Sequence, residues 1–315
     1  MWINNHYLRR CSTVESLVRH INEAYAIHIR QIEMHREFIG QVYILESGQQ
    51  RYALKLFPRH KTADALHALG ILEFLAEQEY PVVSVMRTRE QTSHTILPGD
   101  GRLAVMFGYL DGTDPDGSLE AEPIGEQSGQ LHKLMRRYTG ALLNRTKAEY
   151  IGDFISIMRQ KDCEAGAILD LEQYGNELWS RITLLPRSFC HGDLHTGNMI
   201  QRDGKYVLLD FDDASGDYPS MDAAYLSDAT HFNHFHTSMY DATMKQFERF
   251  YRGYSRVCTL SDEECGAVPD WIAVRHYQIT ARIVGCQGLG SVSKRFFEEQ
   301  HRWLMEWREL CARKG

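Results

Sequence analysis

Proline is scarce in this sequence, and its cysteines show no pairing pattern. Eight prolines and 24 glycines make up about a tenth of the 315 residues, so long disordered or fibrous segments are not expected. The seven cysteines are odd in number, widely spaced and without a Cys-x-x-Cys pair. This pattern argues against a disulfide framework or a zinc ribbon, and it favours a reducing compartment.

Long apolar runs and an excess of positive charge are also missing. No run of about 18 apolar residues occurs, so we expect no membrane span, and residues 1–15 hold no apolar stretch that fits a signal peptide. The 35 basic and 42 acidic residues give a formal net charge of −7, which makes a nucleic-acid backbone a poor partner. We therefore expect a cytoplasmic protein that binds neither nucleic acid nor membranes. The sequence leaves its oligomeric state open.

The length corresponds to about two domains or lobes, and the first part of the chain has the pattern of a small sheet. Ser12 and Glu15 form a capping box that predicts a helix over roughly 13–25. A second helix is predicted over 62–80, where Pro81 ends it. Strand-like runs are found at 26–33, 42–46, 51–57, 82–86 and 102–110.

Turn-forming residues at 111–117 mark the expected boundary, and the chain after them is mainly helical. A short β segment, 188–210, interrupts the helical patterns. Within it the dipeptide Asp203-Gly204 predicts a hairpin turn. The expected fold class is therefore α+β, with a β-rich lobe over 1–109 and a helical lobe over 110–315 that carries the inserted hairpin.

Polar residues gather in one stretch of the inserted β segment. His191, Asp193 and Asn198 lie close together in the chain, and Asp210 follows at the end of the hairpin. Clustered carboxylate and amide oxygens without a cysteine suit Mg²⁺ rather than zinc. Because Mg²⁺ usually completes its coordination shell with substrate phosphates, this cluster implies a nucleotide. A carboxylate that stays off the metal is available to accept a proton.

A lysine on an apolar strand face is the second feature. Alternation along the strand predicted at 51–57 places Lys55 on the face shared by Ala53 and Phe57. A lysine among apolar side chains needs an anionic partner. A nucleotide phosphate or a carboxylate from the following helix would serve.

These motifs together resemble a known enzyme family. The pattern His-Gly-Asp-x-x-x-x-Asn over 191–198, followed by Asp210-Phe211, resembles the catalytic and metal-binding loops of the aminoglycoside phosphotransferase and choline kinase superfamily. That superfamily is a small-molecule branch of the protein-kinase-like fold. Ala53-Leu54-Lys55 resembles its lysine strand, and Leu103–Gly112 resembles the hinge between its lobes. The resemblance covers nearly the whole chain and implies a bilobal, kinase-like fold.

The resemblance implies a role in phosphoryl transfer for each matching residue. Asp193 would accept the proton of the attacking hydroxyl, and His191 would orient the catalytic loop. Asn198 and Asp210 would hold Mg²⁺, and Lys55 would hold the α and β phosphates. The implied phosphoryl donor is ATP, and the sequence leaves GTP open.

Further contacts with the nucleotide are also implied by the resemblance. Backbone groups between Phe107 and Tyr109 would bind the adenine edge. The family carries a glutamate early in the helix after the lysine strand, where it pairs with that lysine. Here the nearest glutamate is Glu73, more than a turn further on; we assign it as a candidate nucleotide-binding residue, and the sequence leaves the partner of Lys55 open. The turn that would cover the phosphates, 34–41, contains a single glycine, Gly40, and is therefore not a glycine-rich loop.

The acceptor implied by the family is a hydroxyl-bearing small molecule, such as an aminoglycoside, choline or homoserine. Three acidic residues lie shortly after the predicted metal ligand Asp210 in the sequence: Asp212, Asp213 and Asp217. We assign them as candidate acceptor-binding residues. Their charge, together with that of Asp228, Glu298 and Glu299 further along the chain, favours a cationic acceptor.

Two other functions stay open at this point. The missing helix glutamate is compatible with a pseudokinase, which binds a nucleotide without catalysis. Alternation of His191, Asp193 and His195 would place all three on one strand face, as in the transition-metal site of a metallohydrolase. Two polar residues have a structural interpretation instead: we expect His132 to be a buried, hydrogen-bonded histidine and Asp222 to fix a loop.

Overall fold

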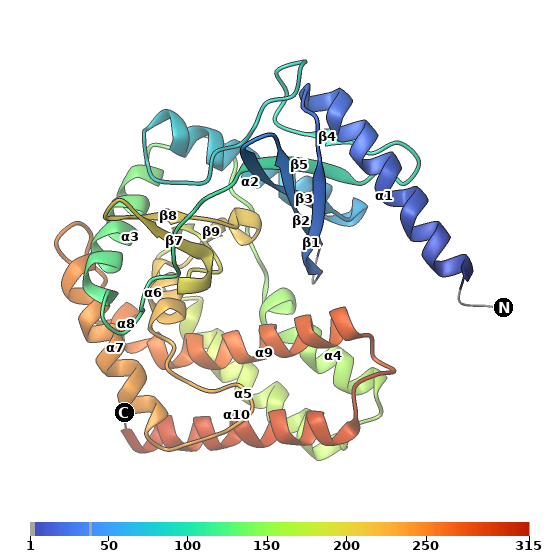
Figure 1. Ribbon diagram of the computed structural model, residues 1–315. Coiled ribbons are helices and arrows are strands. Elements are labelled where there is room, and N and C mark those ends of the chain that lie inside the picture. Colours follow the sequence, from blue (N-terminus) through green and yellow to red (C-terminus); the bar gives the residue numbers. More distant parts are fainter. Residues whose placement is uncertain (1–3, 38–39, 315) are drawn as a thin grey trace. The chain divides into compact units, whose positions relative to one another are not determined.

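The computed structural model describes residues 4–37 and 40–314, and its packing divides the chain into two units (Figure 1). Unit 1 comprises Met1–Gly112 together with Val207–Asp212. Unit 2 comprises Thr113–Tyr206 and Asp213–Gly315. The short segment 207–212 therefore packs with the N-terminal part of the chain, although it follows the predicted catalytic motif in the sequence.

Unit 1 is built on an antiparallel sheet whose strand order is β1-β2-β3-β5-β4. Its elements are α1 (Asn4–Tyr25), β1 (Gln31–Glu37), β2 (Gln41–Ser47), β3 (Gln50–Phe57), η1 (Arg59–Lys61), α2 (Thr62–Glu77), β4 (Thr95–Ile96) and β5 (Leu103–Gly108). Residues 38 and 39, in the turn expected to cover the phosphates, lie outside the described residues.

Each face of this sheet is covered by its own apolar cluster. Ile21 of α1 packs in one cluster with Leu54 and Leu56 of β3. Leu69 of α2 packs in the other cluster with Phe57. Side chains alternate along β3 because a strand turns by half a revolution per residue. The alternation predicted for this strand is therefore confirmed, and it places Lys55 on the face of Phe57, with its ammonium 4.9 Å from the ring centre.

Three predicted element boundaries in unit 1 are wrong. Helix α1 begins at Asn4 rather than at 13, because residues 4–12 contain no glycine or proline to stop it. Ala26 then adopts a left-handed backbone with φ of 56°, which ends the helix, so β1 begins at Gln31 rather than at 26. Helix α2 ends at Glu77, and Glu79 just beyond it also has a φ of 56°.

The segment 82–86 is not the strand that was predicted. It forms only two isolated bridges, one from Val82 to Leu208 and one from Val85 to Phe107. Its backbone groups form hydrogen bonds first with the chain at Leu208 and then with β5. The segment therefore does not pair continuously with one neighbour, as a strand would.

Unit 2 is mainly helical. Its helices are α3 (Ala121–Met135), η2 (Ala148–Gly152), α4 (Asp153–Gln160), α5 (Ala165–Ile182), η3 (Thr196–Asn198), η4 (Phe211–Asp213), α6 (Pro219–Ser227), α7 (Met239–Tyr254), α8 (Asp262–Gly266), α9 (Val268–Gln287) and α10 (Lys294–Lys314). Its short strands pair as β6 (Ser188–Cys190) with β9 (Ser215–Asp217), and as β7 (Met199–Arg202) with β8 (Lys205–Leu208). Elements η4 and β8 each have residues in both units.

Two local features explain how unit 2 is held together. Helices α3 and α7 cross closely at Gly125 and Gly253, where a Cβ atom would overlap a backbone carbonyl of the opposite helix. The β7–β8 hairpin turns at Asp203 and Gly204, whose φ angles are 51° and 72°. Two positive φ angles are typical of a type I′ turn, so the hairpin predicted from this dipeptide is confirmed.

An antiparallel sheet in the N-terminal part and a mostly helical C-terminal part confirm the predicted α+β class. Over residues 4–37 and 40–314, no helix has the length and apolar character needed to cross a membrane.

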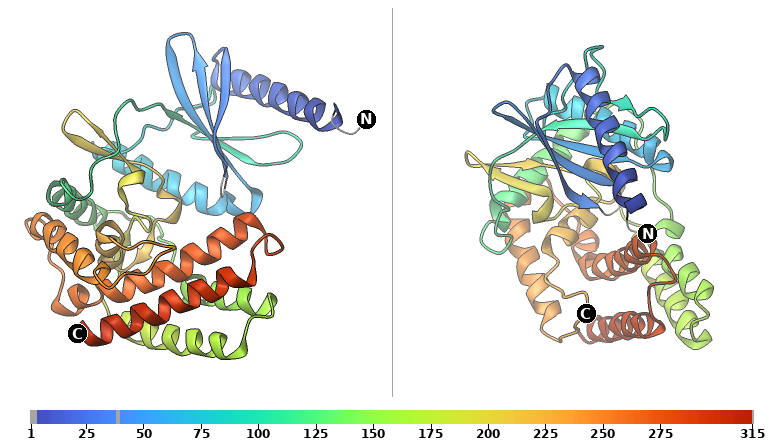
Figure 2. Two further views of the ribbon diagram at one scale, coloured as in Figure 1. Left: turned by 60° about the horizontal axis from the view of Figure 1, so that its bottom comes forward. Right: turned by 45° about the vertical axis from the view of Figure 1, so that its right-hand side comes forward.

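Helices α9 and α10 run side by side (Figure 2). His276 of α9 is buried and contacts two residues of α10. The His276 ring stacks on Trp303, with 3.9 Å between the ring centres, and its Nε2 lies 2.7 Å from Oε1 of Gln300. Burial lowers the pKa of His276 to about 3. The folded protein therefore holds this histidine neutral at a pH where the unfolded chain protonates it.

This burial predicts a pH-dependent loss of stability. Below pH 6.5 the unfolded chain binds a proton that the folded His276 does not, so the free energy of unfolding falls by about 1.4 kcal/mol per pH unit, or about 2 kcal/mol between pH 6.5 and pH 5. Urea unfolding at several pH values measures this slope. His276→Gln should flatten it relative to the wild type, whereas His234→Gln, at an exposed position, should not. Equal slopes in the wild type and in His276→Gln would contradict the prediction.

Candidate active site

The predicted catalytic motif lies in the loop between β6 and β7, in unit 2. The loop starts at His191, directly after β6, and ends with the single turn of η3. Gly192 has a φ of 82°, and a Cβ atom there would overlap the backbone carbonyl of Asp213. Only glycine fits this position, because it combines a left-handed backbone with a close approach of two chain segments.

A buried carboxylate anchors the start of this loop. Asp222 of α6 is fully buried and accepts hydrogen bonds from the backbone N–H groups of His191 (2.6 Å) and Gly192 (2.9 Å). His132 Nε2 lies 3.1 Å from the same carboxylate, and its Nδ1 lies 2.8 Å from the Tyr254 hydroxyl. The structural roles predicted for His132 and Asp222 are confirmed.

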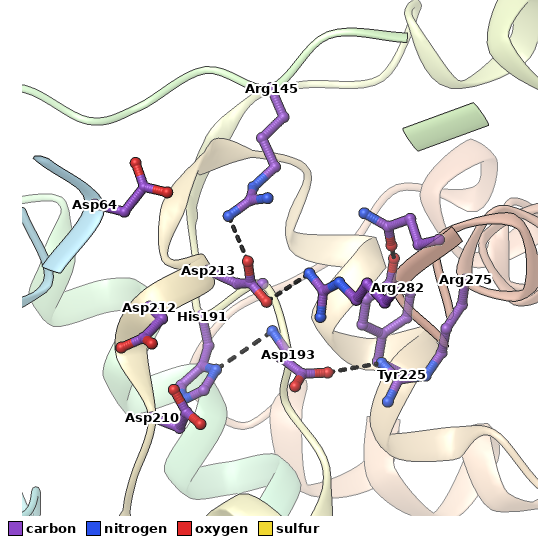
Figure 3. A network of polar contacts seen from close by, with 12 residues as sticks. Asp64, Arg145, His191, Asp193, Asp210, Asp212, Asp213, Tyr225, Arg275 and Arg282 are labelled. Carbon is purple, nitrogen blue, oxygen red and sulfur yellow. Dashed lines mark hydrogen bonds and ion pairs between the residues drawn. The ribbon is translucent and has the colours of Figure 1, made fainter. Parts of the chain in front are cut away.

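Asp193 lies in the middle of the loop, a quarter exposed, with polar groups around its carboxylate (Figure 3). The Asn198 side-chain amide donates to the Asp193 backbone carbonyl (2.9 Å) and to its Oδ2 (3.3 Å). His195 Nε2 lies 3.6 Å from Oδ2, and Arg275 Nη1 lies 3.3 Å from Oδ1. The loop thus brings together the predicted base and the predicted amide ligand.

The surroundings of Asp193 keep it ionised. Burial alone would raise the pKa of this carboxyl group, but the nearby imidazole of His195 and the charges of Arg275 and Arg282 outweigh burial and hold the pKa well below its usual value. At neutral pH the group is a carboxylate. It can therefore accept a hydrogen bond from a hydroxyl group.

Three arginines in this region were not found from the sequence. Asp213 accepts ion pairs from Arg145 and Arg282, both at 2.6 Å, while Arg275 lies over the ring of Tyr225 (Figure 3). Arg275 and Arg282 are seven residues apart, which places them on one face of α9. That spacing was visible in the sequence, but nothing in the linear order connected α9 with the loop at 191–198.

The predicted lysine and metal aspartate meet within unit 1. Lys55 Nζ lies 2.9 Å from Oδ1 of Asp210 and 2.7 Å from Oδ2 of Asp212. Burial would lower the pKa of Lys55, but the two carboxylates outweigh burial and raise it, so the ammonium stays charged. Asp210 adopts a φ of 54°, which is uncommon for an aspartate and directs the chain from β8 into η4.

Glu73, the glutamate nearest to the family's position, does not pair with Lys55. Its carboxylate pairs with Arg87 at 2.7 Å, on the partly exposed side of α2. Glu73 lies 11 residues after the start of α2, whereas Asp210 and Asp212 reach Lys55 from a segment more than 150 residues away in the sequence. Because Lys55 has two carboxylate partners, the missing helix glutamate no longer favours a pseudokinase.

The segment predicted to bind adenine, 107–109, begins with the last two residues of β5 and ends at Tyr109. Phe107 pairs with Ala53 of β3, and the Gly108 N–H donates to the Ser84 carbonyl (2.9 Å). The Tyr109 N–H donates to the Arg51 carbonyl (3.3 Å), and the Arg51 guanidinium lies 4.0 Å from the centre of the Tyr109 ring.

The three acids assigned to the acceptor are all ion-paired. Asp212 pairs with Lys55, and Asp213 pairs with two arginines. Asp217 is buried and binds Arg187 (2.7 Å) and the Tyr150 hydroxyl (2.9 Å). Each of these three carboxylates therefore already has a cationic partner within the protein.

The histidines of the motif do not form a transition-metal site. In the described part of the chain, no three His, Cys, Asp or Glu side chains are grouped so that they could hold a metal ion. His191 is fully buried, while His195 is partly exposed and its Nδ1 accepts the Gly197 N–H (3.1 Å). The ligand set expected for a metallohydrolase is thus missing. Asn198 and Asp210 instead offer amide and carboxylate oxygens, the donors that suit Mg²⁺.

Comparisons with known proteins agree with these motifs. A family model described as the phosphotransferase enzyme family matches residues 29–260. No protein in a search of curated proteins matches the chain.

Several solved structures share the fold at low sequence identity. An amicoumacin kinase in complex with AMP-PNP, Ca²⁺ and Ami is 17% identical, with a TM-score of 0.77 over 94% of this chain and 93% of that chain. A microcompartment-associated aminopropanol kinase is 16% identical, with a TM-score of 0.74 over 96% and 97%. The choline kinase LicA from Streptococcus pneumoniae is 16% identical, with a TM-score of 0.68 over 96% and 99%. These likenesses establish the kinase-like fold that the sequence predicts.

Proposed function

Since this chain belongs to the phosphotransferase enzyme family, we propose that it transfers the γ-phosphoryl group of ATP to a hydroxyl group of a small molecule. The observation that carries the proposal is the ionised Asp193 held beside Asn198 in the loop after β6. Solved kinases with the same fold support the substrate class, because their described acceptors or complexes include choline, aminopropanol and Ami.

Asp193 is the proposed general base. Its carboxylate accepts a hydrogen bond from the acceptor hydroxyl and takes the proton as the oxygen attacks phosphorus. His191 and Gly192, whose backbone groups are bonded to Asp222, hold the loop so that the base keeps one position. Most of the rate enhancement then comes from positioning and from neutralising charge, as is general in phosphoryl transfer.

Asn198 and Asp210 are the proposed ligands of Mg²⁺, which when bound neutralises charge on the phosphates. Both hydrogen bonds from Asn198 to Asp193 use the amide nitrogen, so its amide oxygen is the atom offered to a metal. Lys55 would bind the α and β phosphates, and the backbone at 107–109 would bind the base of the nucleotide. The division into a nucleotide-binding lobe over 1–109 and a catalytic lobe over 110–315 remains part of this proposal.

An acceptor screen with Mg²⁺ and ATP tests the proposal. We expect ADP release to be stimulated by at least one acceptor in a panel of aminoglycosides, macrolides, choline, ethanolamine, homoserine and a protein substrate. In Lys55→Met the stimulated kcat/KM for ATP should fall about tenfold to a hundredfold, because a hydrogen bond to a charged group contributes roughly 1.5–3 kcal/mol.

Lys133→Met is the matched control, because Lys133 is an exposed lysine on α3. It should leave kcat/KM for ATP unchanged. Thermal melting without nucleotide checks that both variants fold. Failure of ATP to raise the melting temperature of the wild type, together with no stimulated ADP release, would contradict the proposed function.

A further inference from the structure

Arg275 has an environment that sets it apart from the other arginines near Asp193. Its guanidinium carbon lies 4.3 Å from the centre of the Tyr225 ring, and only 13% of its side chain is exposed. Tyr225 is itself buried, and its hydroxyl donates to Gln278 of α9. The ring therefore fixes the plane of the guanidinium and covers one of its faces. The N–H groups at the edge of the plane stay directed toward the acids of the site.

The contacts of Arg275 are loose, whereas those of its neighbours are tight. Arg145 and Arg282 each approach one oxygen of Asp213 to 2.6 Å, so that carboxylate is fully paired. Arg275 approaches Asp193 only to 3.3 Å and Asp228 only to 3.9 Å. A guanidinium carries five N–H donors, and these two long contacts use few of them well. Arg275 thus has donors left for another anion.

We propose that Arg275 is an acceptor-binding residue, and that the acceptor carries a carboxylate on the same small molecule whose hydroxyl meets Asp193. This inference rests on the proposed function. It replaces the cationic acceptor expected from the sequence with an anionic or zwitterionic one, a hydroxy acid or a hydroxy amino acid. A planar guanidinium matches a planar carboxylate through two parallel hydrogen bonds, which an ammonium group cannot form.

Charges around Arg275 suit this class of molecule. Asp193 lies on one side of the guanidinium and Asp228 on another, and Asp228 is one-fifth exposed. An ammonium group on the acceptor can pair with Asp228 while the carboxylate binds Arg275. The hydroxyl is then the one polar group of a hydroxy amino acid that still has no partner, and the Asp193 carboxylate accepts its hydrogen bond.

Pairs of acceptor probes that differ only in the carboxylate test the inference. The pairs are threonine with 1-amino-2-propanol, serine with ethanolamine, and homoserine with 3-amino-1-propanol. Calorimetry with the full chain, Mg²⁺ and AMP-PNP gives the Kd of each probe. We expect at least one carboxylated member to bind about tenfold or more tightly than its partner, as a charge-assisted paired contact predicts.

Variants then assign the preference to Arg275. Arg275→Gln should reduce the difference in Kd within a pair to about twofold or less, and Arg275→Lys should retain part of it. Arg252→Gln is the matched control, because Arg252 is an exposed arginine on α7 with a single long contact to Glu122, and it should keep the full difference. Melting temperatures with AMP-PNP verify that each variant folds, and Arg275→Lys carries the test if Arg275→Gln does not.

The inference is overturned if no carboxylated probe binds, or if the amino alcohols bind as tightly as their carboxylated partners. It is also overturned if Arg275→Gln lowers kcat for both members of a pair equally and leaves both Kd values unchanged, since Arg275 would then act on the transition state alone. Stimulated ADP release with an amino alcohol would keep the proposed function intact in these cases. A separate result would contradict the proposed function itself: ADP release that does not depend on Lys55.

Discussion

Asp193→Asn should lower the rate of acceptor-stimulated ADP release by about a thousandfold. The substitution keeps the size of the side chain but removes the carboxylate that would take the proton of the acceptor hydroxyl. Asn198 would still face a side-chain oxygen at this position, so the loop should keep its conformation. Binding of ATP should change by less than about twofold, because Asp193 is assigned to the acceptor and not to the nucleotide.

Single-turnover kinetics and the ATP-induced rise in melting temperature measure these two effects separately. Asp114→Asn is the control, because Asp114 is exposed in the segment before α3. It should leave both quantities unchanged. Retention of more than a tenth of the wild-type rate in Asp193→Asn would show that another group accepts the proton.

Asp222→Ala should lower the free energy of unfolding by about 3–5 kcal/mol. The substitution removes the acceptor of two buried backbone N–H groups, at His191 and Gly192, and the partner of His132. Asp222 and His191 are both fully buried, so bulk solvent does not take the place of the lost carboxylate. The unpaired donors therefore carry their whole desolvation cost. The loop that holds Asp193 should also lose its fixed position, so activity should fall with stability.

Urea unfolding of Asp222→Ala and of Asp114→Ala measures this effect against an exposed acid of the same type. Asp114→Ala should change the free energy of unfolding by less than about 0.5 kcal/mol. A loss below 1 kcal/mol in Asp222→Ala would show that its three hydrogen bonds are replaced or were not formed.

Much of the site could be predicted from local sequence. Residues 191–198 form one loop, so their order already places Asp193 beside Asn198. The dipeptide Asp203-Gly204 determines the hairpin, because both positions need a positive φ. Alternation along β3 determines which face carries Lys55. Each of these inferences depends on neighbours within about eight residues, where backbone geometry links sequence to structure directly.

Partners that are distant in the sequence could not be predicted in the same way. Lys55 pairs with Asp210 and Asp212 rather than with Glu73, because the segment 207–212 packs with unit 1. Sequence spacing suggested a partner on the next helix. Packing supplied two partners from a segment much further along the chain.

The sequence by itself determined the fold class, the loop at 191–198, the hairpin and the likeness to a phosphotransferase family, because periodicity, turn chemistry and a contiguous motif are local properties. Only the tertiary structure decided the electrostatics of the site. Charges act through space, so the three acids assigned to the acceptor each have a cationic partner that is remote in the sequence. Tertiary packing also brings Arg275 of α9 beside Asp193, and the proposal of an acceptor that carries a carboxylate rests on that contact.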